Sequence, residues 1–221
     1  MRVLVIAPHP DDEVLGVGGT IARFAREGAH VAVAIVTKGE AGMFDPALIE
    51  RGRTEAKQCH LLLGVGDTRF LDFPAARLDT VEHHVLNRAF VELIEEVRPD
   101  KVFLPFVGDI HNDHRVVFES ALVALRPTLG THRVTDILCY ETLSETNWNA
   151  PGVSPQFAPN VFVDISRYLD TKLKAAAAYA SQMREFPHER SLEAISCLAK
   201  LRGATVGISA AEAFVQVRRI I

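Results

Sequence analysis

The chain begins MRVLVIAPHPDDEVLGVGG (residues 1–19), an apolar run followed at once by a histidine, a proline and three consecutive acids. Val3–Ala7 is short and aliphatic, which predicts a buried strand. Ligands of open α/β sheets bind beyond the carboxyl ends of the strands, so the polar cluster stands where a site is expected. Adjacent carboxylates repel one another. The cluster is therefore either a solvated turn or a site that binds a positively charged group or ion.

Strand and helix patterns alternate along the rest of the chain. We expect strands at Val3–Ala7, His30–Thr37, Arg69–Phe73, Lys101–Phe106, Ile137–Thr142, Val161–Ile165 and Phe214–Val217. We expect helices at Gly16–Glu27, Leu48–Leu63, Thr80–Val97, His111–Leu125, Tyr168–Met183 and Leu192–Leu201. This alternation predicts an α/β, Rossmann-like three-layer fold with a mostly parallel sheet, whose first five strands take the order 3-2-1-4-5. The proline-rich segment Glu145–Pro159 is expected to be a loop.

Length and composition narrow the class of protein. A chain of 221 residues without a recognisable linker suits a single domain over residues 1–221. The net charge of −4 gives no basic footprint for nucleic acid, and no apolar stretch is long enough to span a membrane. Cys59, Cys139 and Cys197 are far apart and odd in number, which favours reduced thiols in a cytoplasmic protein.

The HPDDE stretch offers ligands for a metal ion. Pro10 fixes one backbone torsion and stiffens the loop, so that His9 and Asp12 can be presented together while Asp11 points elsewhere. Imidazole and carboxylate groups suit zinc or a similar divalent ion. The alternative is a solvated turn, in which aspartates are common.

The glycines that follow, GVGG at residues 16–19, suggest a dinucleotide-binding turn as another alternative. Gly16 and Gly18 would be the first two glycines of the GxGxxG fingerprint, but Ile21 stands at the third position. The run also begins nine residues after Ala7, and acids in front of it would repel a pyrophosphate. A nucleotide-binding protein is therefore the weaker interpretation.

A second motif, HNDH, occupies residues 111–114 beyond the fourth predicted strand. His111 and His114 are three positions apart, so one helical turn places them on the same side. Asp113 could orient a metal-binding histidine through a hydrogen bond to its imidazole ring. The alternative is a polar helix start capped by Asn112 or Asp113. In the expected strand order, strands one and four are neighbours, and both motifs would open into one crevice. His9, Asp12 and one histidine of HNDH would leave a fourth metal position for water, as in catalytic zinc sites.

The pairing of HPDDE after the first strand with HNDH after the fourth resembles the PIG-L/LmbE-like family of zinc-dependent N-acetylglucosaminyl deacetylases. TKGEAG at residues 37–42 and AEAFVQVR at residues 211–218 are also similar to family segments, whereas Tyr179 stands where members often have a histidine. The resemblance implies a zinc-dependent enzyme that removes acetyl from an N-acetylated amino sugar or conjugate. It also implies a homo-oligomer, as relatives often form.

The resemblance further implies a role for each motif residue. His9, Asp12 and His114 would bind Zn²⁺, although Fe²⁺ or Co²⁺ accept similar ligands. Asp11 would be the general base. His111 would be the general acid or oxyanion stabiliser, kept charged and oriented by Asp113.

Other interpretations stay open at this point. The same site would suit a different amide or ester hydrolase. Arg51 and Arg53 are expected on a solvated helix face, and Trp148 either stacks on a sugar ring or anchors its loop. His188 and Arg190 follow Pro187 in a possible rim loop and receive no role.

Overall fold

The computed structural model describes residues 1–128 and 132–221. Within them, one sheet of seven strands has the order β3-β2-β1-β4-β5-β7-β6. The strands are β1 (Arg2–Ala7), β2 (His30–Lys38), β3 (Asp67–Pro74), β4 (Lys101–Pro105), β5 (Asp136–Tyr140), β6 (Val161–Asp164) and β7 (Ala211–Arg219). Strands β1 to β5 run parallel, and β7 pairs antiparallel with both β5 and β6. The predicted order of the first five strands and the mostly parallel sheet are confirmed.

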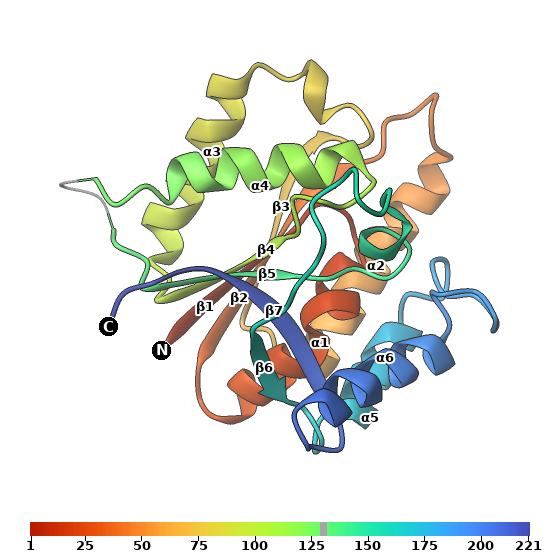
Figure 1. Ribbon diagram of the computed structural model, residues 1–221. Coiled ribbons are helices and arrows are strands. Elements are labelled where there is room, and N and C mark those ends of the chain that lie inside the picture. Colours follow the sequence, from red (N-terminus) through yellow and green to blue (C-terminus); the bar gives the residue numbers. More distant parts are fainter. Residues whose placement is uncertain (129–131) are drawn as a thin grey trace.

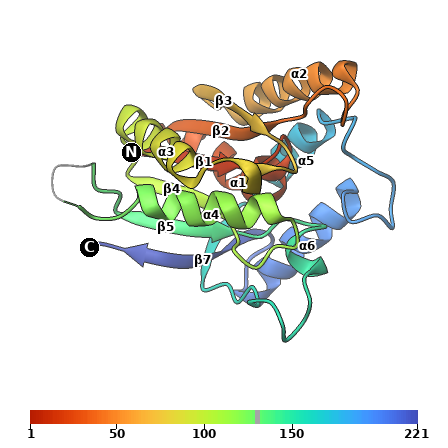
Figure 2. The same cartoon turned by 90° about the horizontal axis from the view of Figure 1, so that it is seen from above.

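Helices cover both faces of the sheet (Figures 1 and 2). They are α1 (Asp12–Arg26), α2 (Pro46–Leu63), α3 (His83–Val97), α4 (Asn112–Ala124), α5 (Leu169–Ala177) and α6 (Leu192–Thr205). One apolar core joins α1, α2, α5 and α6 to the face that carries Val3, Val5 and Val33. The other core joins α3 and α4 to the face that carries Leu4, Ile6 and Ala34. Because side chains alternate along each strand, one buried run serves both cores, and the three-layer prediction is confirmed.

Several predicted boundaries differ from the observed ones. Helix α1 begins at Asp12 rather than Gly16, since the acids of the motif form its first turn. Helix α5 ends at Ala177 rather than Met183, because Ala178 to Met183 form turns that place Tyr179 in the core. The predicted loop at 145–159 contains a short 3₁₀ helix, η2 (Thr146–Trp148). A second one, η1 (Leu78–Thr80), precedes α3.

The glycines of GVGG serve packing inside α1 rather than a phosphate-binding turn. A Cβ on Gly16 would lie 2.3 Å from Tyr140 Cδ2, and one on Gly19 would lie 2.7 Å from Ile165 Cδ1. The segment is fully buried and lies within the helix, away from its N-terminus. This packing removes the basis of the dinucleotide interpretation.

A buried ion pair explains why small residues are needed in this helix. Lys172 Nζ donates to Leu15 O at 2.7 Å and to Glu212 Oε1 at 2.6 Å. Glu212 in turn accepts the backbone N–H groups of Gly19 and Thr20, at 2.9 and 2.7 Å. Two side chains therefore reach the backbone of α1, and a Cβ on Gly18 would lie 3.2 Å from Lys172 Cγ, so glycine at this position leaves room for the lysine.

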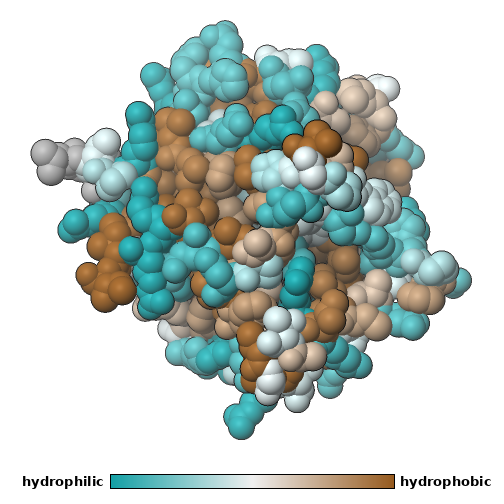
Figure 3. Space-filling view, viewed as in Figure 1, coloured by the Kyte–Doolittle hydropathy of each residue, from teal (hydrophilic) through white to brown (hydrophobic). Residues whose placement is uncertain are grey.

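Among the helices of the described residues, none combines the length and the apolar character needed to cross a bilayer. On the face drawn in Figure 3, hydrophobic residues form separate patches between hydrophilic ones, as is ordinary for folded proteins.

Candidate active site

The two motifs meet at the point where β1 and β4 end. His9 lies just beyond β1, Asp12 begins α1, and His114 lies in the first turn of α4. Asp12 Oδ2 is 3.3 Å from His9 Nδ1 and 3.3 Å from His114 Nε2. One ligand atom from each of the three residues lies within 4.8 Å of the other two. Neighbouring parallel strands thus bring distant parts of the chain into one cluster.

The atoms of this cluster fit a divalent cation. Asp12 and His114 are buried, while the His9 side chain keeps 21% of its surface exposed. His114 Nε2 is buried and has no hydrogen-bond partner among the described residues. A buried polar atom without a partner is uncommon in folded proteins and calls for an unseen ligand. Two imidazole nitrogens and one carboxylate oxygen form a donor set that zinc and similar ions accept.

A second group, His9, His111 and Asp113, is also close enough to share an ion. Its ligand atoms are already engaged within the protein. Asp113 Oδ2 lies 3.0 Å from His9 Nε2 and accepts the backbone N–H of Ala76 at 2.7 Å. His111 Nδ1 accepts the backbone N–H of Asp113 at 3.1 Å. The first group is therefore the better candidate for a metal centre.

In each histidine of the metal cluster, the ring nitrogen that does not face Asp12 lies close to a second carboxylate. Asp113 holds His9 in this way, and Asp109 Oδ2 lies 2.8 Å from His114 Nδ1. Asp109 Oδ1 also accepts a hydrogen bond from Thr146 Oγ1 at 2.6 Å. Carboxylate partners of this kind fix the tautomer and the ring orientation of ligating histidines. Both imidazoles therefore direct their remaining nitrogen toward the centre of the cluster.

The contacts of Asp113 favour His9, rather than His111, as its main partner. Asp113 Oδ2 is 4.0 Å from His111 Nδ1 and is hydrogen-bonded to His9 instead. His111 is the N-cap of α4, and its Nδ1 is the acceptor of the capping bond. In the neutral ring, the proton then resides on Nε2. Burial and the nearby charge of His9 lower the pKa of His111 to about 4, against the pull of Asp113.

Opposite charges outweigh burial within the metal cluster. Burial disfavours ionisation of Asp12, yet His114 and His9 hold the pKa of its carboxyl well below the ordinary value. Burial also disfavours a charged His9, yet hydrogen bonds to Asp113 and Asp12 raise its pKa to about 9. The same balance raises the pKa of His114 to about 10, with Asp12 and Asp109 as the stabilising partners. Protons and a divalent cation would compete for these nitrogens.

Asp11 is directed away from the partners of Asp12. Its backbone has a φ of 108°, which is unfavourable for any residue except glycine and must be held by the surroundings. The backbone N–H donates to Glu13 Oε2 at 3.2 Å, and the carboxylate Oδ2 accepts from Arg190 Nη1 at 2.9 Å. Burial raises the pKa of Asp11, and the Arg190 guanidinium opposes that rise. The two consecutive aspartates thus have separate environments.

Arg190 is a member of the site to which the sequence analysis gave no role. Beside Asp11, its guanidinium contacts Ser144 Oγ at 2.8 Å and Glu145 Oε1 at 3.4 Å. It is 179 positions from Asp11, and no pattern around it marks the contact. Asp109, also missed, was easier to find, since it stands only five positions before His114, in the loop that leads into α4.

The structure also places Tyr179, Arg51 and Arg53, of which only Arg51 lies on the solvated helix face that was expected. Tyr179 is fully buried behind the motif, and its hydroxyl donates to Glu13 Oε1 at 2.6 Å, so it supports the loop rather than the substrate wall. Arg51 is exposed and pairs with Glu55 along α2, as a solvated helix face predicts. Arg53 instead lines the pocket described next.

A hollow of about 410 Å³ opens above the cluster, a size typical of sites for small molecules. His9, Asp11 and His111 line it, and the ring centres of the two histidines are 4.4 Å apart. Its apolar wall is formed by Phe44, Leu48, Ile49 and Phe70. Its cationic side chains are those of Lys38, Arg53, Arg184 and Arg190. The arrangement can hold a polar ligand of modest size against a candidate metal ion.

A known protein family contains both the HPDDE and the HNDH motif regions of this chain. The model of the PIG-L family, described as GlcNAc-PI de-N-acetylase, matches residues 4–125, a range that contains both motifs.

Individual relatives extend the similarity over most of the chain. Diacetylchitobiose deacetylase of Thermococcus kodakarensis is 31% identical over 198 residues, covering 83% of this chain and 71% of the relative. A 1D-myo-inositol 2-acetamido-2-deoxy-alpha-D-glucopyranoside deacetylase of Saccharomonospora viridis is 28% identical, covering 98% and 95%. The structure of N,N'-diacetylchitobiose deacetylase from Pyrococcus horikoshii superposes with a TM-score of 0.77 at 26% identity, covering 98% of this chain and 83% of that one.

Proposed function

This chain belongs to the PIG-L family, and we propose on that basis that it is a metal-dependent deacetylase acting on an N-acetylated amino sugar or sugar conjugate. The observation that carries the proposal is the cluster of His9, Asp12 and His114 beneath an open pocket. Two relatives named for the deacetylation of N-acetylglucosamine compounds support the substrate class.

We assign His9, Asp12 and His114 as the metal ligands, with zinc as the expected ion and Fe²⁺ or Co²⁺ as alternatives. Such an ion, when bound, supplies Lewis-acid activation of water and of the amide carbonyl. Asp113 and Asp109 act through His9 and His114, whose rings they orient.

Asp11 is assigned as the general base. Its Oδ2 is held by Arg190, which leaves Oδ1 to receive the proton of the attacking water. A side chain that accepts a proton in the transition state typically contributes about 10²–10⁴-fold to the rate. The proton gained by Asp11 is then available to the amine nitrogen as the C–N bond breaks.

His111 is assigned as the donor that stabilises the developing oxyanion. Because Nδ1 accepts the capping bond of α4, the neutral ring presents Nε2–H to the pocket. Pre-oriented donors of this type typically contribute about 10²–10³-fold, since they need no reorganisation during the reaction. His111 thus donates a hydrogen bond as a neutral imidazole, rather than acting as an imidazolium held by Asp113.

Three broader expectations stay predictions. We expect residues 1–221 to act as one domain, which is consistent with β6 and β7 extending the sheet that β1 begins. We expect a cytoplasmic protein, with the free thiols of Cys59, Cys139 and Cys197 in support. We also expect a homo-oligomer, which sedimentation would test.

The proposed function is tested by metal analysis of the purified protein together with acetate release. We expect about one divalent ion per chain and acetate from N-acetylglucosamine or N,N'-diacetylchitobiose. Release of acetate from N-acetyl amino acids, but from neither sugar, would favour the alternative of another amide hydrolase. A metal-free protein without activity toward either class, even after addition of zinc, would refute the proposal.

A further inference from the structure

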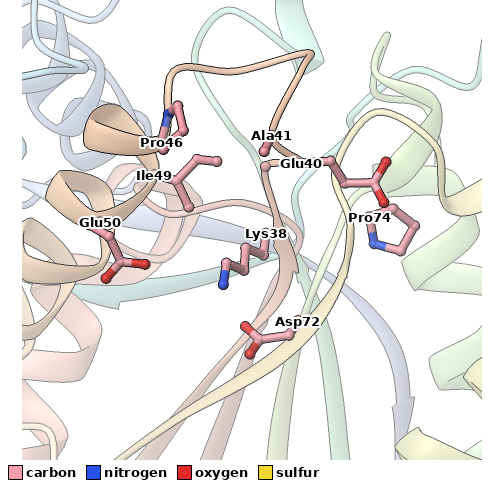
Figure 4. A pocket seen from close by; sticks show the side chains of 9 residues that line it. Lys38, Glu40, Ala41, Pro46, Ile49, Glu50, Asp72 and Pro74 are labelled. Carbon is pink, nitrogen blue, oxygen red and sulfur yellow. The ribbon is translucent and has the colours of Figure 1, made fainter.

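A group of buried titratable side chains lies behind the HPDDE loop. Its members come from α1, from α2 and from the turn after α5, and they are Glu13, Cys59, His60 and Tyr179. Each of them is 2% exposed or less, and none lines the pocket above the metal cluster. Nor does any of them line the neighbouring hollow of about 580 Å³, which shares Lys38 and Ile49 with the pocket (Figure 4). Any effect of this buried group on the reaction must therefore pass through other residues.

Glu13 is the centre of the buried group. Its Oε1 accepts the Tyr179 hydroxyl at 2.6 Å and the Cys59 thiol at 3.9 Å. His60 Nε2 lies 3.3 Å from the same oxygen but has no hydrogen-bond partner in the described part of the chain. Burial and the nearby Glu13 raise the pKa of Tyr179 well above its ordinary value, so the hydroxyl keeps its proton and remains a donor. Because a buried carboxylate is unfavourable without such donors, Glu13 depends chiefly on Tyr179 at this oxygen.

The other oxygen of Glu13 holds the backbone of Asp11. Glu13 Oε2 accepts the Asp11 N–H at 3.2 Å. A carboxylate that reaches back to the backbone N–H of an N-cap residue is one half of a capping box. Asp11 is the N-cap of α1, with a φ of 108° and a ψ of −25°. Since this conformation costs energy for any residue with a side chain, it needs a bond of this kind to persist.

The unusual backbone of Asp11 frees its carboxylate for the pocket. At the starts of α2, α4 and α6, the side chain of the N-cap accepts a backbone N–H of the first turn, and these N-caps are Asp45, His111 and Ser191. Their φ values are −62°, −74° and −89°, in the extended region that is usual for N-caps. Asp11 makes no such side-chain bond, and its carboxylate lines the pocket instead. With an extended backbone, we expect this carboxylate to turn toward the N–H groups of α1 and away from a bound substrate.

We propose that Tyr179 is a positioning residue for the general base: its hydroxyl fixes Glu13, and Glu13 fixes the backbone conformation that directs the Asp11 carboxylate into the pocket. The inference rests on the proposed function, in which Asp11 takes the proton of the attacking water. Tyr179 and Arg190 belong to one segment, residues 179–190. This segment therefore holds Asp11 from two sides, at the N–H through Glu13 and at the carboxylate through Arg190.

The first test is Tyr179→Phe, which keeps the buried ring and removes only the hydroxyl. Loss of one hydrogen bond to a charged group should lower kcat for N,N'-diacetylchitobiose about tenfold. KM and metal content should stay unchanged, because Tyr179 lies outside both the pocket lining and the ligand cluster. Residues 179–190 should also stay attached to α2, since the backbone N–H and the hydroxyl of Ser181 donate to Glu55 at 3.0 and 2.5 Å.

Tyr140→Phe is the matched control. Tyr140 is also fully buried, and its hydroxyl donates to the backbone oxygen of Ile6 at 2.9 Å, away from Glu13. Both variants lose one buried hydroxyl bond, so a similar loss of stability is expected in both, but only Tyr179→Phe should lower kcat. An unchanged kcat in Tyr179→Phe, or an equal fall in Tyr140→Phe, would overturn the proposal.

Glu13→Gln distinguishes a path through Glu13 from a general loosening of the core. The amide keeps an oxygen that can accept the Asp11 N–H, but it carries no charge and depends less on the Tyr179 hydroxyl. If Tyr179 acts through Glu13, Tyr179→Phe should lower kcat only about twofold in the Glu13→Gln background, against about tenfold in the wild type. Additive effects of the two substitutions would contradict the proposed path.

Amide hydrogen exchange, followed by NMR in the zinc-loaded protein, tests the backbone of Asp11 without turnover. We expect the Asp11 N–H to exchange about tenfold faster in Tyr179→Phe than in the wild type, and at the wild-type rate in Tyr140→Phe. An unchanged rate in Tyr179→Phe would refute the positioning role. If the wild-type protein released no acetate from any sugar, the proposed function would fail, and the exchange rates would still decide whether Tyr179 holds the backbone of Asp11.

Discussion

The two walls of the pocket are built in opposite ways. The motif wall consists of His9, Asp11 and His111, with Asp12 and His114 buried beneath them, and these residues stand at strand ends and in the first turns of helices. The loop wall consists of residues 144–148 and 181–190, where η2 is the only regular element and both Trp148 and Arg184 are exposed. Rigid elements hold groups to the precision that bond-making requires, whereas loops vary without disturbing the core. This contrast assigns the chemistry to the motif wall and substrate choice to the loop wall.

The walls are nevertheless bonded to each other at two points. Thr146 reaches His114 through Asp109, and Arg190 reaches Asp11 directly. The motif wall would carry all of the chemistry, and the loop wall all of the substrate choice, only if these contacts had no effect on the reaction. Substitutions in each wall, and at the contacts between them, can measure how far the division holds.

The largest effect is expected from a ligand of the motif wall. His9→Ala removes one of three donors while disturbing packing least, because His9 is the most exposed of the three. We expect the purified variant to contain little metal and to release acetate no faster than buffer alone. His83→Ala, on the exposed surface of α3, is the control. Full metal content with undiminished turnover in His9→Ala would break the assignment of the cluster.

The second largest effect is expected from Asp11→Asn, which should separate catalysis from metal binding within the motif wall. Asp11→Asn keeps the size of the side chain but weakens its ability to accept a proton, so kcat should fall by about 10²–10⁴-fold. Metal content should stay at the wild-type level, because Asp11 lies outside the ligand cluster. Loss of metal together with activity would show instead that Asp11 supports the ligands.

Asp109→Ala tests the contact between the walls that passes through His114. Removing a carboxylate from behind a ligating histidine typically weakens metal binding by about 10–100-fold. We expect a loss of that size in a competition titration with a chelator, together with recovered activity at excess metal. Thr146→Val, which removes only the outer hydroxyl, should have the same direction and a smaller size. Unchanged affinity in Asp109→Ala would mean that His114 needs no such support.

The motif wall could be predicted from the sequence, because its members follow directly from two strand ends. Once β1 and β4 are neighbours, HPDDE and HNDH have to share an edge of the sheet. The partner of Asp113 could not be predicted in this way. It depends on contacts with His9 and with the backbone N–H groups of Ala76 and Leu78, which lie 104, 37 and 35 positions away in the chain.

The loop wall was largely beyond prediction, for a related reason. Helical patterning extended α5 to Met183, whereas the chain turns after Ala177 so that Tyr179 can reach Glu13. That turn is set by one buried hydrogen bond between residues 166 positions apart, and it places the segment that leads to Arg190. Periodicity reports which side of a helix is apolar, but it carries no information on contacts of this range.

Arg190→Met gives the smallest of these effects and tests the division most directly. Loss of one hydrogen bond to a charged group costs about 1.5 kcal/mol, so kcat should fall about tenfold. Metal content should be unchanged. Added guanidinium should restore part of the activity of Arg190→Gly, because a free cation can replace the missing charge but cannot replace a merely structural side chain. For the same reason, Arg190→Lys should retain more activity than Arg190→Met. Arg184→Met is the matched control, since that guanidinium lines the pocket without an ion pair to Asp11. If Arg190→Met changed only KM, Arg190 would belong to substrate choice alone, and the two walls would be functionally separate.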